Sequence, residues 1–290
     1  MKVFTKYATI ALAALAFASC DDNFEPLAGN DTNVAAPSAI QAISADSLPG
    51  QIILHWQVPS DSNYYLLKVK YYDHLSGKDV FRVASVYQDS MLIDNTLRKF
   101  GNYDFSFQTF NEANVGSQTQ SFSAMSGRAT ITETISTSTI PLTADQLSTN
   151  NQEPSEGPIA NLLDGDIYSF FHTRWSSPQI PMPQYVQIDL TEPIEDFQFY
   201  YQNRAWSQVG PEILEVQISN DGETWETIKT ISAGLPSAGG AEYTSEIFRP
   251  GKTFTHFRFN CVQTYGSKNY FNLAEFRLYD VDIQTYDPEA

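Results

Sequence analysis

The residues with the clearest potential for chemistry form a short acidic loop within residues 159–176, which read IANLLDGDIYSFFHTRWS. Asp164 and Asp166 flank Gly165, and Ser169 follows shortly after. Two carboxylates, a hydroxyl and the exposed carbonyls of a tight loop are oxygen ligands that a hard cation such as Ca²⁺ takes. A plain Asp-Gly turn would have the same sequence. This segment alone leaves both interpretations open.

The sequence contains none of the familiar catalytic motifs. Catalysis needs a positioned nucleophile, a base or a carboxylate pair. The patterns G-x-S-x-G and H-E-x-x-H and the P-loop are missing. Asp and Glu are plentiful, but most fall at turns or on the solvent faces of alternating runs. His55 and His74 lie on different predicted elements. We therefore expect a protein without enzymatic activity.

The charge of the chain excludes one class of partner. The 290 residues include 17 Lys and Arg against 34 Asp and Glu, a formal net charge of −17. A field of this sign repels phosphate backbones, and no cluster of Lys or Arg opposes it, so we expect no nucleic-acid partner. Solubility is the general interpretation of such acidity. The length allows about two domains.

The first residues are expected to form an export signal and an anchor. Residues 1–20 read MKVFTKYATIALAALAFASC, with Lys2 and Lys6 before a short apolar run that is too short to span a bilayer. The segment FASC resembles the bacterial lipobox, which implies lipidation of Cys20. Asp21 and Asp22 resemble the export signal of Bacteroidota surface lipoproteins. An ordinary secretory signal with an incidental Cys is the alternative.

The signal peptide is expected to span residues 1–19. The small polar residues that follow it predict a flexible tether at 20–34. With Cys20 assigned to the anchor, Cys261 is the only other cysteine. It lies in the alternating run FRFNCVQ, which predicts a buried strand residue.

Residues 35–128 read as an all-β domain. Alternating or apolar runs at 51–56, 64–73, 80–87 and 103–111 are separated by turn signals. Several short strands at this spacing predict a β-sandwich. The arrangement resembles fibronectin type III domains, an immunoglobulin-like fold. Trp56 corresponds to the core Trp of that family, and Leu97 and Tyr103 to its tyrosine corner. The resemblance implies a spacer or interaction module.

A segment rich in Thr and Ser at 129–140 is expected to link this domain to a second one. Composition leaves open whether it is a stiff solvated connection or an edge strand. A second domain at 141–281 and a tail at 282–290 follow. Alternating runs at 183–194, 194–206, 211–228, 254–262 and 269–281 predict a second all-β domain. Within it, Asn220-Asp221-Gly222 predicts a hairpin turn, and Trp175 and Trp225 are expected in the core.

The second domain resembles the discoidin fold, also called the coagulation factor 5/8 type C domain, and within it family 32 carbohydrate-binding modules. The resemblance rests on an ordered set of pieces rather than on any single one. It implies an eight-stranded jelly-roll sandwich. The pieces are NLLDGDIYSFFHT, YVQIDL, Arg204, SNDGETW, HFRF and LAEFRLY.

The same resemblance implies a structural Ca²⁺ beside the acidic loop. Glu275, near the end of the domain, would be one of its ligands, so the ion would tie the two ends of the domain together. The implied ligands are the side chains of Asp164, Asp166, Ser169 and Glu275 and backbone carbonyls such as those of Ile159 and Ala274.

The resemblance also implies a sugar site at the rim of the sandwich. His172 and Arg204 correspond to the binding His and Arg of the family, and both can donate hydrogen bonds to vicinal hydroxyls. Trp206, Tyr265 and Tyr270 are the loop aromatics that could stack on a pyranose. Phe171 stands where the family has a Trp, and no match to the binding Asn is evident. Both departures count against a galactose-type specificity.

The order of anchor, tether, spacer and binding domain predicts a non-catalytic glycan-binding lipoprotein of the outer membrane, facing the cell exterior. It would capture polysaccharide or host glycan for an uptake system, with possible partner proteins of that system. The alternative is an adhesion or structural protein of a surface complex that binds a protein partner. The polar and aromatic loops, such as QTYGSKNY at 263–270, favour sugar over lipid.

Overall fold

The computed structural model describes residues 34–60, 63–207 and 209–290. The predicted signal peptide, Cys20 and residues 20–33 of the predicted tether lie outside them. One compact unit contains the described residues up to Ile131 together with Asp287–Ala290, and the other is Thr132–Tyr286. In the described part of the chain, no helix is long and apolar enough to cross a membrane.

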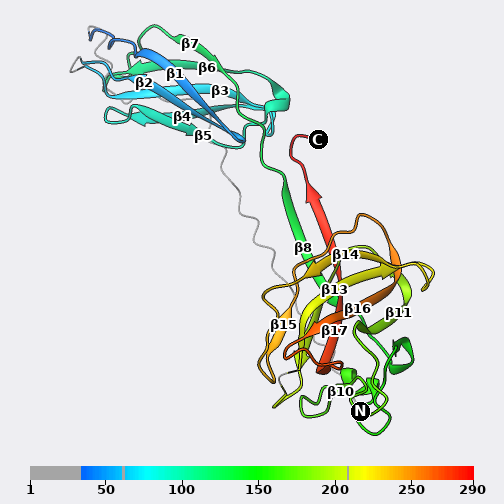
Figure 1. Cartoon of the computed structure of the whole chain (residues 1–290). Coiled ribbons are helices and arrows are strands. Elements are labelled where there is room, and N and C mark those ends of the chain that lie inside the picture. The colour runs from blue at the N-terminus through cyan, green and yellow to red at the C-terminus, as the bar shows by residue number, and fades with distance from the viewer. Residues whose placement is uncertain (1–33, 61–62, 208) are drawn as a thin grey trace, which may run out of the picture. The chain divides into compact units, whose positions relative to one another are not determined.

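The first unit is a sandwich of two antiparallel sheets (Figure 1). Its β-branched and aromatic runs alternate inward and outward with the period of a strand. The predicted all-β fold of this unit is confirmed, while its membership of the fibronectin type III family stays a prediction. One sheet has the order β1 (Gln41–Leu48), β2 (Gln51–Gln57), β5 (Ser90–Ile93); the other has β4 (Lys78–Ser85), β3 (Leu66–Asp73), β6 (Tyr103–Phe110), β7 (Gln120–Ala124).

The core of the first unit contains the residues that the sequence singled out. Trp56 is buried, and its ring nitrogen donates to the carbonyl of Gln88 at 3.0 Å. The hydroxyl oxygen of Tyr103 accepts a hydrogen bond from the backbone N–H of Leu97 at 2.9 Å. Buried aromatic residues with a polar group usually satisfy it in this way. The Leu97–Tyr103 contact expected of a tyrosine corner is therefore present.

The last four residues of the chain belong to this first unit. The carboxylate of Glu289 accepts hydrogen bonds from the backbone N–H groups of Arg98, Lys99 and Ala129, each at 2.9 Å. These groups lie at the short helix η1 (Arg98–Phe100) and just before Ile131. The end of the chain thus satisfies backbone donors that would otherwise need water.

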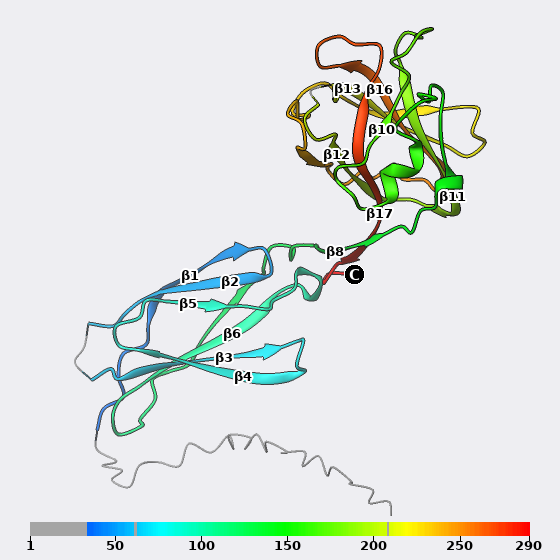
Figure 2. The ribbon, with the colours of Figure 1, turned by 90° about the horizontal axis from the view of Figure 1, so that it is seen from below.

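The second unit is also a sandwich of two antiparallel sheets (Figures 1 and 2). Two short helices, η2 (Ala144–Gln146) and η3 (Ile159–Leu163), precede β10. One sheet has the order β14 (Glu226–Ile231), β13 (Pro211–Ser219), β16 (Phe254–Thr264), β11 (Gln184–Ile194), β9 (Leu147–Thr149); the other has β10 (Phe171–His172), β17 (Asn272–Tyr286), β12 (Phe197–Asn203), β15 (Glu242–Thr244), with β8 (Thr132–Thr139) also on β17.

The predicted all-β sandwich of this unit is confirmed, and its two sheets hold ten described strands where eight were expected. Aromatic rings fill the space between the sheets: Phe199 contacts the rings of Phe257, Phe259 and Phe276. Cys261 is fully buried, as predicted, and its burial raises the pKa of the thiol.

Residues 129–140 were expected to be either a solvated linker or an edge strand. Most of this segment, Thr132–Thr139, forms strand β8. It pairs with the end of β17, from Thr139 opposite Tyr279 to Thr132 opposite Tyr286. Its residues are exposed, so this ribbon is held by backbone hydrogen bonds and β-branched residues rather than by a core. The last strand therefore runs to Tyr286, past the domain end expected at 281.

Candidate functional site

An open hollow of about 440 Å³ lies between the loop before β10 and the loop after β12. Arg204 is the charged group that lines it. The guanidinium carbon of Arg204 lies 3.3 Å from the centre of the Phe170 ring, a cation–π contact. Among the described residues, no group accepts a hydrogen bond from this guanidinium. The Phe170 ring thus holds the guanidinium in place, and the N–H groups of Arg204 remain available to a ligand.

Two exposed aromatic rings form one wall of the hollow. Trp206 is 88% exposed and Tyr168 65% exposed, yet the two rings stack with centroids 5.7 Å apart and planes 23° apart. Large aromatic side chains seldom gather on a surface without a role in binding. The pair offers a flat apolar platform next to the guanidinium of Arg204.

Tyr168 was missed by the sequence analysis, although it lies in the acidic loop. Asp164 accepts a hydrogen bond from the backbone N–H of Asp166 at 2.8 Å, and Asp166 accepts one from that of Tyr168 at 3.0 Å. Such turns, in which a carboxylate binds the backbone two residues on, fix the course of a loop. The predicted cation loop therefore also presents an aromatic ring to the hollow.

The Trp206 loop is held by a neighbouring loop. Trp206 has a φ of 58°, a conformation that non-glycine residues seldom adopt. The side-chain amide of Asn203 donates to the carbonyls of Pro236 and Ala238 at 2.8 and 3.1 Å. A Cβ atom on Gly239 would lie 2.7–2.8 Å from backbone atoms of Trp206 and Ser207. Close packing of Gly239 thus supports the strained turn.

His172, a predicted sugar ligand, lies behind this surface. It is 4% exposed, its Nδ1 lies 2.5 Å from the carbonyl of Thr173, and its Nε2 lies 3.2 Å from the amide nitrogen of Asn272. Burial lowers the pKa of His172, which favours the neutral ring. Both ring nitrogens have protein partners, so His172 packs under the loops rather than facing the hollow.

The two predicted loop tyrosines do not line the hollow either. The hydroxyl of Tyr265 donates to the carbonyl of Leu235 at 2.6 Å. The ring of Tyr270 lies 5.4 Å from that of His172. Of the five predicted sugar ligands, Arg204 and Trp206 are brought together here, and Tyr168 and Phe170 join them.

The residues of the predicted cation site are partly assembled. Glu275 is buried, and its Oε1 has no hydrogen-bond partner among the described residues. Burial and the nearby charge of Asp164 raise the pKa of Glu275. The hydroxyl of Ser169 donates to Asp164 at 2.7 Å. An unpartnered buried oxygen beside a second carboxylate is what a cation would satisfy, so these residues fit the predicted ion.

Few acidic side chains are available at the predicted cation site. The described residues contain no cluster of three or more His, Cys, Asp or Glu that could hold a metal. A cation here would take Asp164 and Glu275 together with a hydroxyl and backbone carbonyls, as Ca²⁺ accepts and transition metals do not favour. Ile159 begins η3 and Ala274 precedes Glu275 in β17, so both lie on the elements that would supply such carbonyls.

A buried carboxylate that the sequence analysis missed, Glu153, fixes a neighbouring loop. It is 2% exposed and accepts hydrogen bonds from the hydroxyl of Ser155 at 2.6 Å and from the backbone of Trp175 and Ser176. Burial alone would raise the pKa of Glu153, but these bonds outweigh it and lower the pKa to about 2. The expected core positions of Trp175 and Trp225 are both wrong: Trp175 is 45% exposed. Trp225 is half-buried and packs against the guanidinium of Arg258 rather than in the core.

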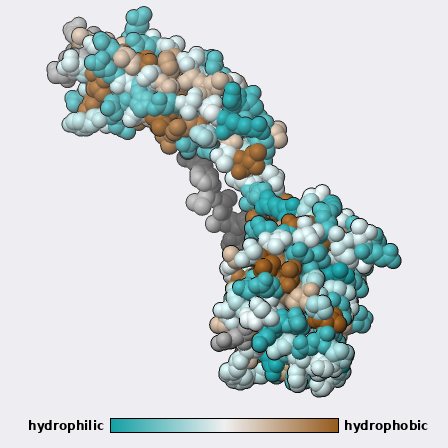
Figure 3. Space-filling model, in the orientation of Figure 1, coloured by the Kyte–Doolittle hydropathy of each residue, from teal (hydrophilic) through white to brown (hydrophobic). Residues whose placement is uncertain are grey.

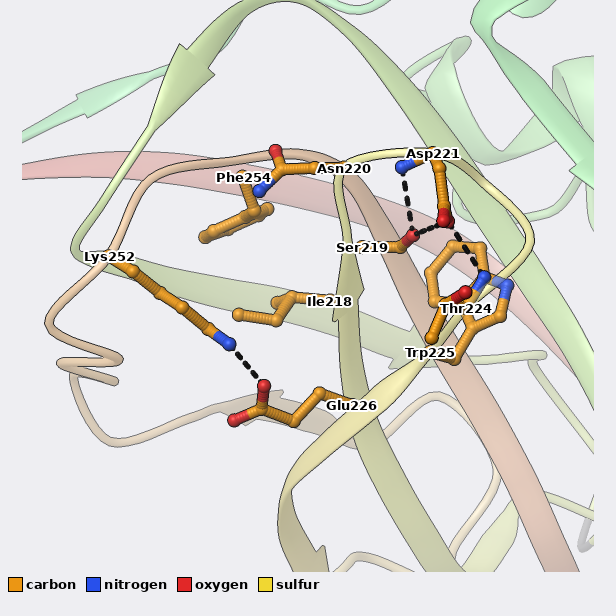
Figure 4. A pocket seen from close by; sticks show the side chains of 9 residues that line it. All are labelled: Ile218, Ser219, Asn220, Asp221, Thr224, Trp225, Glu226, Lys252 and Phe254. Carbon is orange, nitrogen blue, oxygen red and sulfur yellow. Dashed lines mark hydrogen bonds and ion pairs between the residues drawn. The ribbon is translucent and has the colours of Figure 1, made fainter.

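Another hollow, of about 320 Å³, lies beside the hairpin that the Asn-Asp-Gly turn predicted (Figure 4). Lys252 and Glu226 form an ion pair at its mouth, and Trp225 forms part of its wall. The Asp221 carboxylate accepts hydrogen bonds from Glu223 and Thr224. These bonds order the turn and lower the pKa of Asp221.

Residues 146–276 match the F5/8 type C domain family, and this match lies within the unit Thr132–Tyr286 that carries the loops above. The chain is also similar to a number of solved structures, and three of them illustrate the likeness. A module named CpGH89CBM32-5 from Clostridium perfringens, in complex with GalNAc-β-1,3-galactose, shows 20% identity and a TM-score of 0.41 over 49% of this chain and 99% of that one. The family 32 module of C. perfringens NanJ, in complex with galactose, shows 18% identity and a TM-score of 0.41 over 50% and 99%. A SusE-like protein shows 13% identity and a TM-score of 0.39 over 85% and 99%.

Proposed function

We propose that the second unit binds carbohydrate without catalysis, in the hollow formed by Tyr168, Phe170, Arg204 and Trp206. One observation carries the proposal: two exposed aromatic rings stack beside a guanidinium whose donors have no acceptor among the described residues. A pyranose has an apolar face of C–H groups and an equatorial ring of hydroxyls. The aromatic rings match the first and Arg204 the second.

The hollow is open, so a bound sugar would bury little surface. We therefore expect an affinity on the order of 0.1–1 mM per site. Tight capture would require several copies of the protein on one cell to bind the same polymer. Such multivalent binding raises the avidity without any new contact at each site. The match of residues 146–276 to the F5/8 type C domain supports a binding role for this unit.

The cellular setting is part of the same proposal. Cys20 would be lipidated and would hold the chain on the outer membrane, with the first unit as a spacer. The protein would then capture polysaccharide or host glycan for an uptake system, together with partner proteins of that system. The FASC segment and the order of the segments along the chain support this setting.

A glycan array at dense display tests the sugar site, using the chain from residue 21 onward. We expect binding by the parent chain and loss of binding by Arg204→Ala, because loss of two or more hydrogen bonds costs about 1.5–3 kcal/mol. Arg249→Ala is the matched control, since it removes an exposed arginine of the same unit far from these loops in the sequence. A folded Arg204→Ala chain that binds as well as the parent would refute this site. An array without any hit would favour the alternative of a protein partner.

A further inference from the structure

The outward face of strands β13, β16 and β11 carries an ordered set of polar side chains. Gln187 lies opposite Arg258, and Arg258 lies opposite Gln217, so the three form a row across three strands. The rows on either side have the same form. They consist of Tyr185, Asn260 and Glu215, and of Asp189, His256 and Ser219.

Arg258, at the centre of this face, is held by two aromatic rings. Its guanidinium carbon lies 3.8 Å from the centre of the Tyr185 ring and 3.7 Å from that of the Trp225 ring. Its Nη2 donates to Gln187 at 2.7 Å. Its Nε is buried and has no hydrogen-bond partner among the described residues. An arginine fixed in this way loses little further side-chain entropy when it binds a ligand.

Hydrogen bonds extend from Arg258 to one side of the face. Gln187 donates to Asp189 at 2.9 Å, and His256 Nδ1 lies 2.7 Å from the same carboxylate oxygen. The chain Arg258–Gln187–Asp189–His256 thus holds four planar polar groups in fixed positions.

The other side of the face has its own network. Glu215 accepts hydrogen bonds from Asn260 at 2.9 Å and from Gln217 at 3.1 Å. No position in the three rows is aliphatic. Most outward faces of sheets carry flexible polar chains that water satisfies, whereas this one presents ordered amides and carboxylates beside two aromatic rings.

The chemistry of this face selects a class of ligand. Asp189 and Glu215 flank Arg258 in neighbouring rows, so an anionic ligand would be repelled. Amides, carboxylates and a guanidinium suit a neutral ligand with many hydroxyls. Neighbouring strands lie about 4.8 Å apart, close to the length of one monosaccharide unit in an extended chain.

We propose that this face is a second carbohydrate site, which takes several consecutive units of an extended neutral glycan across β11, β16 and β13. Trp225 borders both this face and the hollow in Figure 4, so the site continues toward the hairpin. The loop hollow at Arg204 takes a single unit or a chain end. The ligand class rests on the proposed function, but the surface and its residues are separate.

Affinity electrophoresis of the chain from residue 21 onward tests this proposal, with galactan, galactomannan, xyloglucan and mixed-linkage β-glucan in the gels. Calorimetric titration then compares the monosaccharide and the six-unit oligosaccharide of a polysaccharide that retards the parent. We expect the double variant Gln187→Ala, Gln217→Ala to bind the six-unit oligosaccharide about tenfold or more weakly, since two hydrogen-bonding groups are lost. Its monosaccharide binding should be unchanged.

Gln284→Ala is the matched control, because Gln284 is an exposed glutamine at the far end of β17. Thermal melts verify that each variant is folded. If the folded double variant binds the six-unit oligosaccharide as the parent does, or if no polysaccharide retards the parent, this second site is refuted. Arg204→Ala separates the two sites, because it should abolish monosaccharide binding and leave the binding of the oligosaccharide by the sheet face. If Arg204→Ala still binds the monosaccharide, only the loop site is refuted.

Discussion

Tyr168 and Trp206 stack with ring centroids 5.7 Å apart, although Tyr168 lies in the acidic loop before β10 and Trp206 lies in the turn after β12. Two exposed rings gain little from each other in water, since each keeps most of its surface exposed. The contact therefore does more to shape the surface than to stabilise the fold.

Replacing Trp206 by Ala should abolish glycan binding and leave the free energy of unfolding within about 0.5 kcal/mol of the parent, because the side chain is 88% exposed. The array and a denaturant titration measure the two effects. Tyr87→Ala is the matched control, since Tyr87 is 93% exposed in the first unit. Equal loss of binding in both variants would show that the array reports aromatic adhesion rather than this site.

Gly239→Ala should weaken binding by an indirect route. The new Cβ would lie 2.7–2.8 Å from backbone atoms of Trp206 and Ser207, so one of the two loops must move. We expect a loss of about 1–3 kcal/mol of stability together with weaker binding. Gly251→Asn is the control: its φ of 70° suits Asn, and nothing lies within 4 Å of its Cβ position. An unchanged melting curve for Gly239→Ala would contradict the close packing.

The strands of the second unit were largely predictable because alternation alone reports which side of a sheet a residue faces. Val186 and Ile188 are buried, while Gln187 between them and Asp189 after them face outward, as the run YVQIDL indicated. The same rule could not give the register between strands. The alignment of Gln187 with Arg258 and Gln217 follows from pairings that no local pattern encodes.

The site was less predictable because loops carry it. Resemblance supplied Arg204, but it also placed His172 at the surface, where the structure has it buried beside Asn272. Strand β10 has only two residues, and both are buried, so alternation fails there. Tyr168 gave no signal, because exposure of a loop aromatic depends on neighbours distant in the sequence. Trp175 was expected in the core for the same reason, since its sequence does not show which distant residues surround it.

The anchor can be tested apart from the described residues. We expect Cys20→Ser to leave the protein soluble or unprocessed, because the thiol that would carry the lipid is lost. Fractionation of cells after a high-salt wash measures this, and the parent chain is the reference. A Cys20→Ser chain that still sediments with membranes would rule out a lipid at this residue.

Glu153 should make stability depend on acid pH. Burial opposes the ionised form, but hydrogen bonds from Ser155 and Ser176 lower the pKa from 4.5 to about 2. The folded state therefore holds the ionised carboxylate more tightly than the unfolded state does. Its contribution is present above about pH 4.5 and is lost as the pH falls toward 2.

Glu153→Gln should accordingly lower stability at pH 7 and flatten the fall in stability between pH 4.5 and 2. Denaturant titrations at several pH values measure this difference. Glu156→Gln is the control, since Glu156 receives one hydrogen bond from the ring of Trp175 at an exposed site. A parallel pH dependence for Glu153→Gln and the parent would contradict the assignment.

The predicted Ca²⁺ should act on stability through the acidic loop. An ion that binds only the folded chain adds about 2.7 kcal/mol when its free concentration is 100 times its Kd. Calcium would also satisfy the unpartnered Oε1 of Glu275 and relieve its repulsion from Asp164. We expect the melting temperature of the second unit to fall in excess chelator and to recover with added Ca²⁺. Glu275→Gln should remove this response.

Binding offers a second measurement, because Asp166 holds the backbone of Tyr168 in the same loop. Chelation should therefore weaken glycan binding along with stability, even though the ion would not contact the sugar. Asp282→Asn is the control, since it removes an exposed carboxylate of the same strand as Glu275 without touching the loop. Unchanged melting in chelator, together with no metal by elemental analysis, would rule out the ion. The acidic loop would then be a turn that its own hydrogen bonds hold in place.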